Sequence, residues 1–268
     1  MEPEAVEMVG VGKAYGRKVL FRGVSLAVRR GGCAALTGRN GVGKTTLLRI
    51  AAGLAAPTEG TVRRAADLSI GYVPENLPRI PMTARQFLRH MAAVEGLGEA
   101  DAAEGQRLIR DFFLDDLMDL PMSGLSKGTL QKVAVAQALM RPRDLLILDE
   151  PLSGQDEKSR EVFINRVLAM RKGGAAVLLA CHEAFLAERL ADAAYSLTPD
   201  GLTPAAPEAA CAWAVMGFEP DDEIEAPPSV RCWKRGGRLY LSGPVKDCDG
   251  LIADMMQRGY SLREMHDE

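Results

Sequence analysis

Apolar and polar positions in the N-terminal part of the chain follow two different periods. Short apolar runs predict strands. These runs are Ala5 to Val11, Ser25 to Val28, Cys33 to Thr37, Thr61 to Arg64 and Leu68 to Val73. Apolar residues at helical spacing predict a helix over Lys44 to Ala52, directly after a glycine-rich loop. A strand, a loop and a helix in this order are typical of α/β folds.

The pattern becomes helical between Pro78 and Met140, and prolines at positions 78, 81 and 121 interrupt it. Thr83 is a good N-cap for a helix that reaches about Val94. We therefore expect a helical lobe, at about residues 78–140, inserted into the α/β pattern.

After the lobe, strands and helices alternate again. The expected strands are Leu145 to Leu148, Ala175 to Ala180 and Ala194 to Leu197, and the expected helices are Asp156 to Met170 and Ala184 to Leu190. Alternation of this kind predicts a parallel sheet covered on both faces.

Two breaks, at Pro199 to Pro207 and at Glu219 to Pro228, separate a C-terminal segment. This segment contains a hairpin (Arg231 to Lys234 and Arg238 to Leu241), a helix (Asp247 to Arg258) and a strand (Tyr260 to Met265). We expect a main domain over residues 1–205 and a small α+β extension over residues 206–268.

Composition narrows the function classes. The net charge of −3 gives no reason to expect a nucleic-acid partner, which favours a concentrated basic face. No apolar run approaches the roughly 18 residues of a membrane span, and the acidic N-terminus lacks the pattern of a secretory signal, so we expect a cytoplasmic chain. The five widely spaced cysteines suggest reduced thiols rather than a metal or redox site.

The glycine-rich loop matches the phosphate-binding pattern G-x-x-x-x-G-K-[ST] and lies between a predicted strand and a predicted helix. Its residues are Gly38, Arg39, Asn40, Gly41, Val42, Gly43, Lys44, Thr45 and Thr46. Backbone N–H groups of such a loop surround phosphates, and the helix N-terminus adds its positive end. Lys44 would contact the β and γ phosphates, and the Thr45 hydroxyl would bind Mg²⁺.

The apolar run Leu145 to Leu148 is followed by Asp149 and Glu150. Beside a phosphate-binding loop, the first acid is placed to hold the Mg²⁺ shell, and the second can orient or deprotonate an attacking water. Together the two patterns predict a nucleotide hydrolase.

Between these two patterns, Leu125-Ser126-Lys127-Gly128-Thr129 resembles the L-S-G-G-Q signature of the ATP-binding cassette (ABC) family. The family's other motifs follow in order: Tyr15 before the phosphate loop, Gly71-Tyr72-Val73-Pro74-Glu75 at its Q-loop, Ser153-Gly154-Gln155-Asp156 at its D-loop, and His182 as its switch histidine. The resemblance covers about residues 5–200.

The resemblance implies a P-loop NTPase of ABC type, with a mixed β-sheet core and a helical lobe, that binds ATP and Mg²⁺. It assigns adenine stacking to Tyr15, catalysis to Lys44, Glu150 and His182, and metal binding to Thr45, Glu75 and Asp149. It also implies that Ser126 and Gly128 contact the γ-phosphate held by a second ABC subunit, identical or not, in a head-to-tail dimer.

Three departures from the family pattern stand out. Glu75 replaces a glutamine and adds negative charge beside the triphosphate. Lys127 and Thr129 replace a signature glycine and glutamine, but the anion contacts come mainly from Ser126 and from the backbone near Gly128. Nothing in the sequence explains Gln155 in the D-loop.

The resemblance further implies an ATPase subunit that powers a separate transmembrane permease and lies on the inner face of the cell membrane. The L-S-K-G signature and the short extension resemble exporter subunits of the multidrug, peptide and bacteriocin type. A soluble, assembly-type ABC ATPase with a cytosolic partner is the alternative. The extension itself is either a ligand-sensing module or a capping, dimer-stabilising element.

Overall fold

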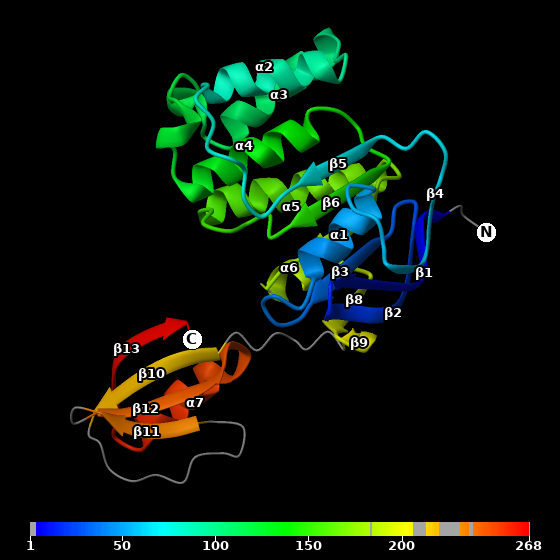
Figure 1. Cartoon of the computed structure of the whole chain (residues 1–268). Helices are drawn as coiled ribbons and strands as arrows, with labels where there is room; N and C mark the ends of the chain where they lie inside the picture. Colours follow the sequence, from blue (N-terminus) through cyan, green and yellow to red (C-terminus); the bar gives the residue numbers. More distant parts are fainter. Residues whose placement is uncertain (1–3, 183, 206–212, 220–230, 236–237, 268) are drawn as a thin grey trace. The chain divides into compact units, whose positions relative to one another are not determined.

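The computed structural model describes residues 4–182, 184–205, 213–219, 231–235 and 238–267. The chain divides into two compact units, Met1–Ala206 and Pro207–Glu268, which we describe one at a time. Figure 1 gives the labels of the helices and strands.

A six-stranded sheet forms the centre of the first unit, in the order β5-β6-β7-β3-β8-β9. Its strands are β3 (Cys33–Thr37), β5 (Ile70–Val73), β6 (Leu145–Asp149), β7 (Ala176–Ala180), β8 (Ala193–Thr198) and β9 (Gly201–Ala205). All neighbouring pairs are parallel except β8 and β9. The parallel strands therefore end at one common edge, where ligands bind in folds of this kind.

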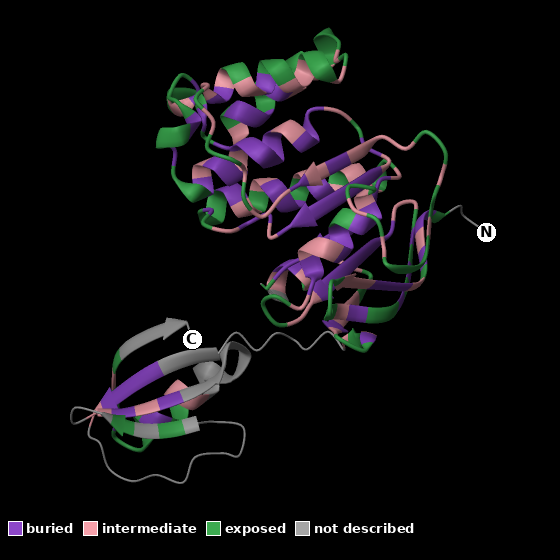
Figure 2. Ribbon diagram, in the orientation of Figure 1, coloured by how far each residue is buried: buried purple, intermediate pink, exposed green. Residues whose placement is uncertain are grey.

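The central strands β3, β6 and β7 are buried on both faces, as is usual for the middle of a parallel sheet. Leu145 and Ile147 of β6 belong to the same hydrophobic cluster as helix α1 (Lys44–Ala52). Leu146 and Leu148 point the other way and share a cluster with helices α4 (Lys127–Leu139) and α5 (Glu157–Lys172). Figure 2 shows these strands as the buried centre of the unit. Helix α6 (Ala184–Leu190) follows β7.

A second, antiparallel sheet has the order β2-β1-β4. The strands of this sheet are β1 (Glu4–Tyr15), β2 (Lys18–Arg29) and β4 (Glu59–Arg64), and the expected mixed strand arrangement of the core is confirmed. Only two residues connect β1 to β2, so the strands pair as a hairpin, with Tyr15 opposite Lys18. Both strands are 12 residues long because exposed polar positions continue the pairing beyond the apolar runs.

The lobe carries α2 (Ala84–Val94), α3 (Glu99–Asp111) and α4, which lie together in the upper part of Figure 1. Thr83 caps α2: its Oγ1 accepts from Gln86 N at 3.1 Å, and the Gln86 side chain accepts from Thr83 N at 2.9 Å. Short 3₁₀ turns at Asp115–Leu117 and Met122–Gly124 connect α3 to α4.

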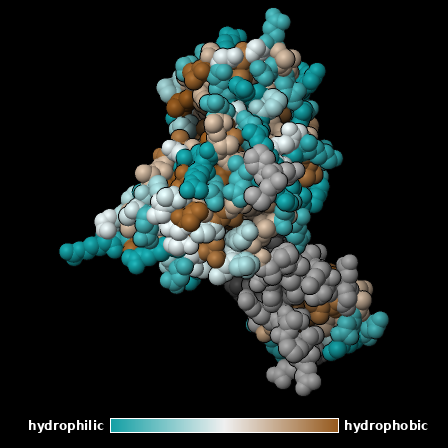
Figure 3. Space-filling model, turned by 90° about the vertical axis from the view of Figure 1, so that its right-hand side faces the viewer, coloured by the Kyte–Doolittle hydropathy of each residue, from teal (hydrophilic) through white to brown (hydrophobic). Residues whose placement is uncertain are grey.

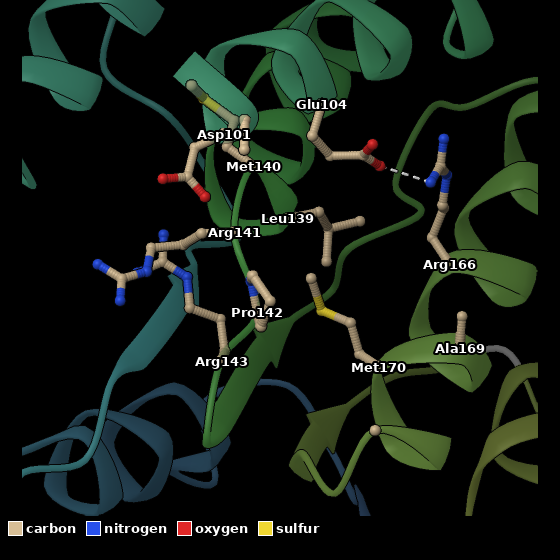
Figure 4. Close-up of a pocket in the computed structure, with 12 residues that line it drawn as sticks. Asp101, Glu104, Leu139, Met140, Arg141, Pro142, Arg143, Arg166, Ala169 and Met170 are labelled. Carbon is tan, nitrogen blue, oxygen red and sulfur yellow. Dashed lines mark hydrogen bonds and ion pairs between the residues drawn. The ribbon is translucent and has the colours of Figure 1, made fainter. Parts of the chain in front are cut away.

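A cavity of about 430 Å³ lies between α3, the end of α4 and α5. Figure 4 shows apolar side chains around it, including Leu139, Met140 and Met170, with the ion pair of Glu104 and Arg166 at one side. The two charged groups are 2.6 Å apart and join α3 to α5. None of the predicted site residues lines this cavity.

The second unit is an antiparallel sheet, β11-β12-β10-β13, packed against helix α7. Its elements are β10 (Trp213–Glu219), β11 (Arg231–Arg235), β12 (Arg238–Pro244), α7 (Val245–Gln257) and β13 (Ser261–Asp267). Met216, Phe218, Leu239, Leu241 and Met255 form its buried core.

The structure agrees only in part with the two predicted breaks in regular structure. The first, Pro199 to Pro207, contains strand β9, which pairs with β8. The second lies outside the described residues except for Glu219, whose carboxylate contacts Arg238 at 3.1 Å and Arg263 at 2.9 Å. Strand β10 was not anticipated.

Over the part of the chain that the structure describes, no helix is both long and apolar enough to cross a bilayer. On the face shown in Figure 3, hydrophobic residues are scattered among hydrophilic ones.

Among the described residues, each unit has a hydrophobic core built from its own side chains, so the first unit should fold without the second. We expect a chain that ends at residue 205 to unfold at a thermal midpoint close to that of the first unit in the full chain, measured by calorimetry. A chain that ends at Thr198 is the control: it lacks β9 and should melt lower. Failure of the 205-residue chain to fold would contradict the division.

Candidate nucleotide-binding site

The phosphate-binding loop joins β3 to α1, and two of its glycines are required by the backbone. Gly43 has φ 114°, and a Cβ there would lie 2.8 Å from the Phe21 ring. Gly38 has φ 135°, and a Cβ there would lie 2.8 Å from the Leu197 carbonyl oxygen. Residues with side chains rarely adopt this left-handed region, so both the angle and the space favour glycine.

A cavity of about 530 Å³ opens beside this loop. It brings together residues of the loop, Leu20 of β2, and residues at or just after the ends of β5, β6 and β7. Its lining is Leu20, Arg39, Asn40, Gly41, Gly43, Lys44, Thr45, Thr46, Glu75, Asp149, Glu150, Ser153 and His182. The residues come from distant parts of the sequence because the parallel strands end at the same edge.

Lys44 is 8% exposed and lies at the first turn of α1. Its Nζ donates to the Gly38 carbonyl oxygen at 2.7 Å and lies 3.2 Å from His182 Nε2. The ammonium group is therefore held at the loop, where a phosphate would meet it.

His182 Nε2 also lies 3.3 Å from Glu150 Oε1. The same nitrogen thus faces a cation and a carboxylate. When it carries a proton it can donate to Glu150, and when it does not it can accept from Lys44. His182 therefore lies between Lys44 and Glu150 and can form a hydrogen bond with either of them.

Glu150 adopts φ 48°, a left-handed conformation that is unusual for a residue with a side chain. Its backbone N–H donates to the Ala180 carbonyl oxygen at the end of β7, at 2.9 Å. Strain of this kind is common at functional sites.

Asp149 is 1% exposed, and burial raises the pKa of its carboxyl group above the ordinary value. A hydrogen bond with Thr45 opposes the shift, and the charge of Glu75 adds to it. Asp149 Oδ2 is buried and has no hydrogen-bond partner. A cation bound to this oxygen would supply the partner that the buried carboxylate oxygen lacks.

The donor set fits Mg²⁺, because Asp149, Thr45 and Glu75 offer hard oxygen ligands. Among the described residues, no group of three or more His, Cys, Asp or Glu is arranged to hold a metal ion. Mg²⁺ usually keeps several water ligands and takes phosphate oxygens from a bound nucleotide, and these oxygens would complete the coordination shell.

Five predicted site residues do not line the cavity: Tyr15, Gly38, Val42, Ser126 and Gly128. Tyr15 is 57% exposed at the end of β1, with Lys13 Nζ 4.8 Å from its ring centroid. Ser126 caps α4, its Oγ accepting from Thr129 N at 3.1 Å.

Gly128 packs so closely against the D-loop that a Cβ would lie 2.0 Å from the Gly154 carbonyl oxygen. Because neither Ser126 nor Gly128 lines the cavity beside the phosphate loop, the signature does not contribute to that cavity within one chain.

Sequence reasoning missed Leu20 and Ser153 as lining residues. Leu20 belongs to β2 and to no motif, so no sequence signal marks it. Ser153 stands in the D-loop pattern and could have been included.

Removing the buried charge of Asp149 should stabilise the protein at neutral pH. A raised pKa means that the ionised carboxylate disfavours the folded state, so this cost appears as pH rises through the folded-state pKa. We expect Asp149→Asn, without Mg²⁺, to raise the thermal midpoint at pH 7 by a few degrees, and by less near pH 4.

Asp144→Asn is the matched control. Hydrogen bonds from Ser69 N and Arg30 lower the pKa of Asp144, so its removal should destabilise the protein at pH 7. Equal shifts for the two variants, or a pH-independent shift for Asp149→Asn, would contradict the assigned burial cost.

Comparisons with known proteins agree with this geometry. Residues 21–153 match the family model described as "ABC transporter". A zinc import ATP-binding protein ZnuC from Halorhodospira halophila is 34% identical over 182 residues, which are 66% of this chain and 68% of that protein. The ZnuC of Rickettsia conorii is 32% identical over 231 residues, 81% of this chain and 96% of that protein.

A solved structure described as the ATP-binding subunit of an ABC transporter has a TM-score of 0.68 at 29% identity, over 75% of this chain and 89% of that one. The expected ABC-type fold is confirmed. The exporter subtype gains no support, because the named relatives are zinc import proteins. The chain belongs to the ATP-binding cassette family and is an ATPase.

Proposed function

We propose that this chain is the ATP-hydrolysing subunit of a membrane transporter, bound to a separate permease on the cytoplasmic face. The observation that best supports ATP hydrolysis is a cavity that gathers Lys44, Asp149, Glu150 and His182 at the edge of the central sheet, and the match to the family model described as "ABC transporter" supports the transporter role. These groups are those needed to bind and hydrolyse a triphosphate.

In this proposal the loop backbone and the N-terminus of α1 surround the β and γ phosphates, and Lys44 neutralises part of their charge. Mg²⁺, held by Thr45 and Asp149 with Glu75 nearby, would offset the charge on the phosphate oxygens. Glu150 accepts a proton from the attacking water, and His182 orients both Glu150 and the γ-phosphate.

We also propose that two ABC subunits bind head to tail. Ser126 and Gly128 lie outside the chain's own cavity, at the N-terminus of a 13-residue helix. That position suits contact with a γ-phosphate held by the other subunit. Exposed Tyr15 would stack on the adenine.

The similar proteins are zinc import ATP-binding proteins, which favours import, and a metal ion such as zinc, over the exporter type that the signature suggested. The permease would select the substrate. The second unit would cap the cassette or stabilise the dimer.

Glu150→Gln should lower ATP turnover by about 100-fold or more, because the amide cannot accept the proton. The side chain keeps its shape, so ATP affinity should stay within about threefold. Steady-state turnover and binding of a fluorescent ATP analogue would measure both. Undiminished turnover would remove Glu150 from the role of base.

The transporter assignment predicts a membrane partner. A tagged chain purified from gently solubilised membranes of its host should bring a multi-span membrane protein in stoichiometric yield, identified by mass spectrometry. A soluble partner only, with full ATPase activity, would contradict the proposal and favour the assembly-type alternative.

A further inference from the structure

Gln131 is a buried polar residue that contacts two motifs at once. It lies on α4, one turn after Gly128, and is 1% exposed. Its Nε2 donates to the Pro74 carbonyl oxygen at 3.0 Å and to the Glu150 carbonyl oxygen at 3.3 Å. One side chain of the lobe therefore reaches the edge of the central sheet.

The chemistry of the two partners fixes the orientation of this amide. Both are carbonyl oxygens, which only accept, so the NH₂ group must face them and supply one hydrogen to each. A side chain of the same size without two N–H donors could not make this bridge.

The bridge spans two neighbouring strand ends. Pro74 follows β5 and Glu150 follows β6, and these strands are parallel, with Val73 opposite Leu148. Pro74 directly precedes Glu75, so both strand ends carry an acid that lines the nucleotide cavity.

Glu150 needs such support because its backbone is left-handed, at φ 48°. Its N–H is held by the Ala180 carbonyl oxygen of β7, at 2.9 Å, and its carbonyl oxygen accepts from Gln131 and from Ser153 N, the latter at 3.3 Å. Gln131 thus contributes to fixing the peptide group that follows the carboxylate-bearing residue.

Two neighbouring contacts hold the start of α4, and with it Gln131, against the segment after β6. Gly128 packs directly on the backbone of Gly154. Lys132, the residue after Gln131, forms an ion pair with Asp156 at 2.5 Å. The first two turns of α4 are therefore fixed against the segment that follows Glu150.

We infer that Gln131 is a positioning residue for hydrolysis: its amide bridge holds the strand ends that carry Glu75 and Glu150 and ties them to the signature helix. This inference rests on the proposed role of Glu150. A positioning residue affects the rate of the chemical step more than ATP binding, because the phosphate-binding loop is not part of the bridge.

The test is Gln131→Met in the full-length chain, since methionine has a similar length, favours helices and has no N–H donor. We expect kcat to fall about 10- to 100-fold while the ATP KM and the affinity for a fluorescent ATP analogue stay within about threefold. In the Glu150→Gln background the same change should cause no further loss of turnover.

Gln137→Met is the matched control, because Gln137 lies on the same helix and its Nε2 bonds Glu95 at 2.8 Å, inside the lobe. Its kcat should stay within about threefold of the wild-type value. Gln131→Ala, which removes the amide without adding a charge, tests the bridge again if Gln131→Met does not fold. Thermal melting checks each variant.

A wild-type kcat in folded Gln131→Met beside an inactive Glu150→Gln would overturn the positioning role alone. ATP affinity that falls in proportion to kcat, or an equal loss in Gln137→Met, would also overturn it. Normal turnover in Glu150→Gln would instead overturn the proposed base, and the inference with it.

Discussion

The site depends on placing charged groups at the buried edge of a parallel sheet. Asp149 is almost fully buried, and this burial disfavours the charged carboxylate and raises its pKa. Lys44 lies in the same cavity at 8% exposure. Groups in this environment interact strongly with a bound polyphosphate and its cation because little water screens them. The burial that disfavours the charge of Asp149 in the folded chain thus also strengthens its interaction with a bound cation.

The packing of the rest of the first unit holds this edge of the sheet in place. Strands β6 and β7 are buried along their whole length, so their ends are held rigidly by packing on both faces. Glycines 38 and 43 let the loop turn tightly between β3 and α1. Contacts from the lobe, through Gln131 and Lys132, reach the segment after β6. Rigid elements therefore support the site from several directions.

The sequence predicted well the features that depend on local chemistry. The bounds of β3, α1 and α6 agree with the predicted ranges, and Thr83 caps α2, because apolar period and capping are encoded locally. Strand β10 and the pairing of β1 with β4 depend on contacts between distant segments, which local patterns do not show. Strand β9 pairs locally with β8, but the prolines in and around it make its sequence resemble a break. The cavity gathers Lys44, Glu75, Asp149, Glu150 and His182, whereas Tyr15 and Ser126 lie outside it. The contacts of His182 with Lys44 and Glu150 could not be predicted from the spacing of these residues, because the strand order brings the three side chains together.

The central claim is that the phosphate loop and the carboxylates at the strand ends form one site for a nucleotide with its metal ion. Electron paramagnetic resonance with Mn²⁺ in place of Mg²⁺ tests it directly. The account predicts a tight Mn²⁺ site that appears only when a non-hydrolysable ATP analogue is added and that is lost in Asp149→Ala. Equal Mn²⁺ affinity with and without the analogue, or an unchanged site in Asp149→Ala, would contradict it.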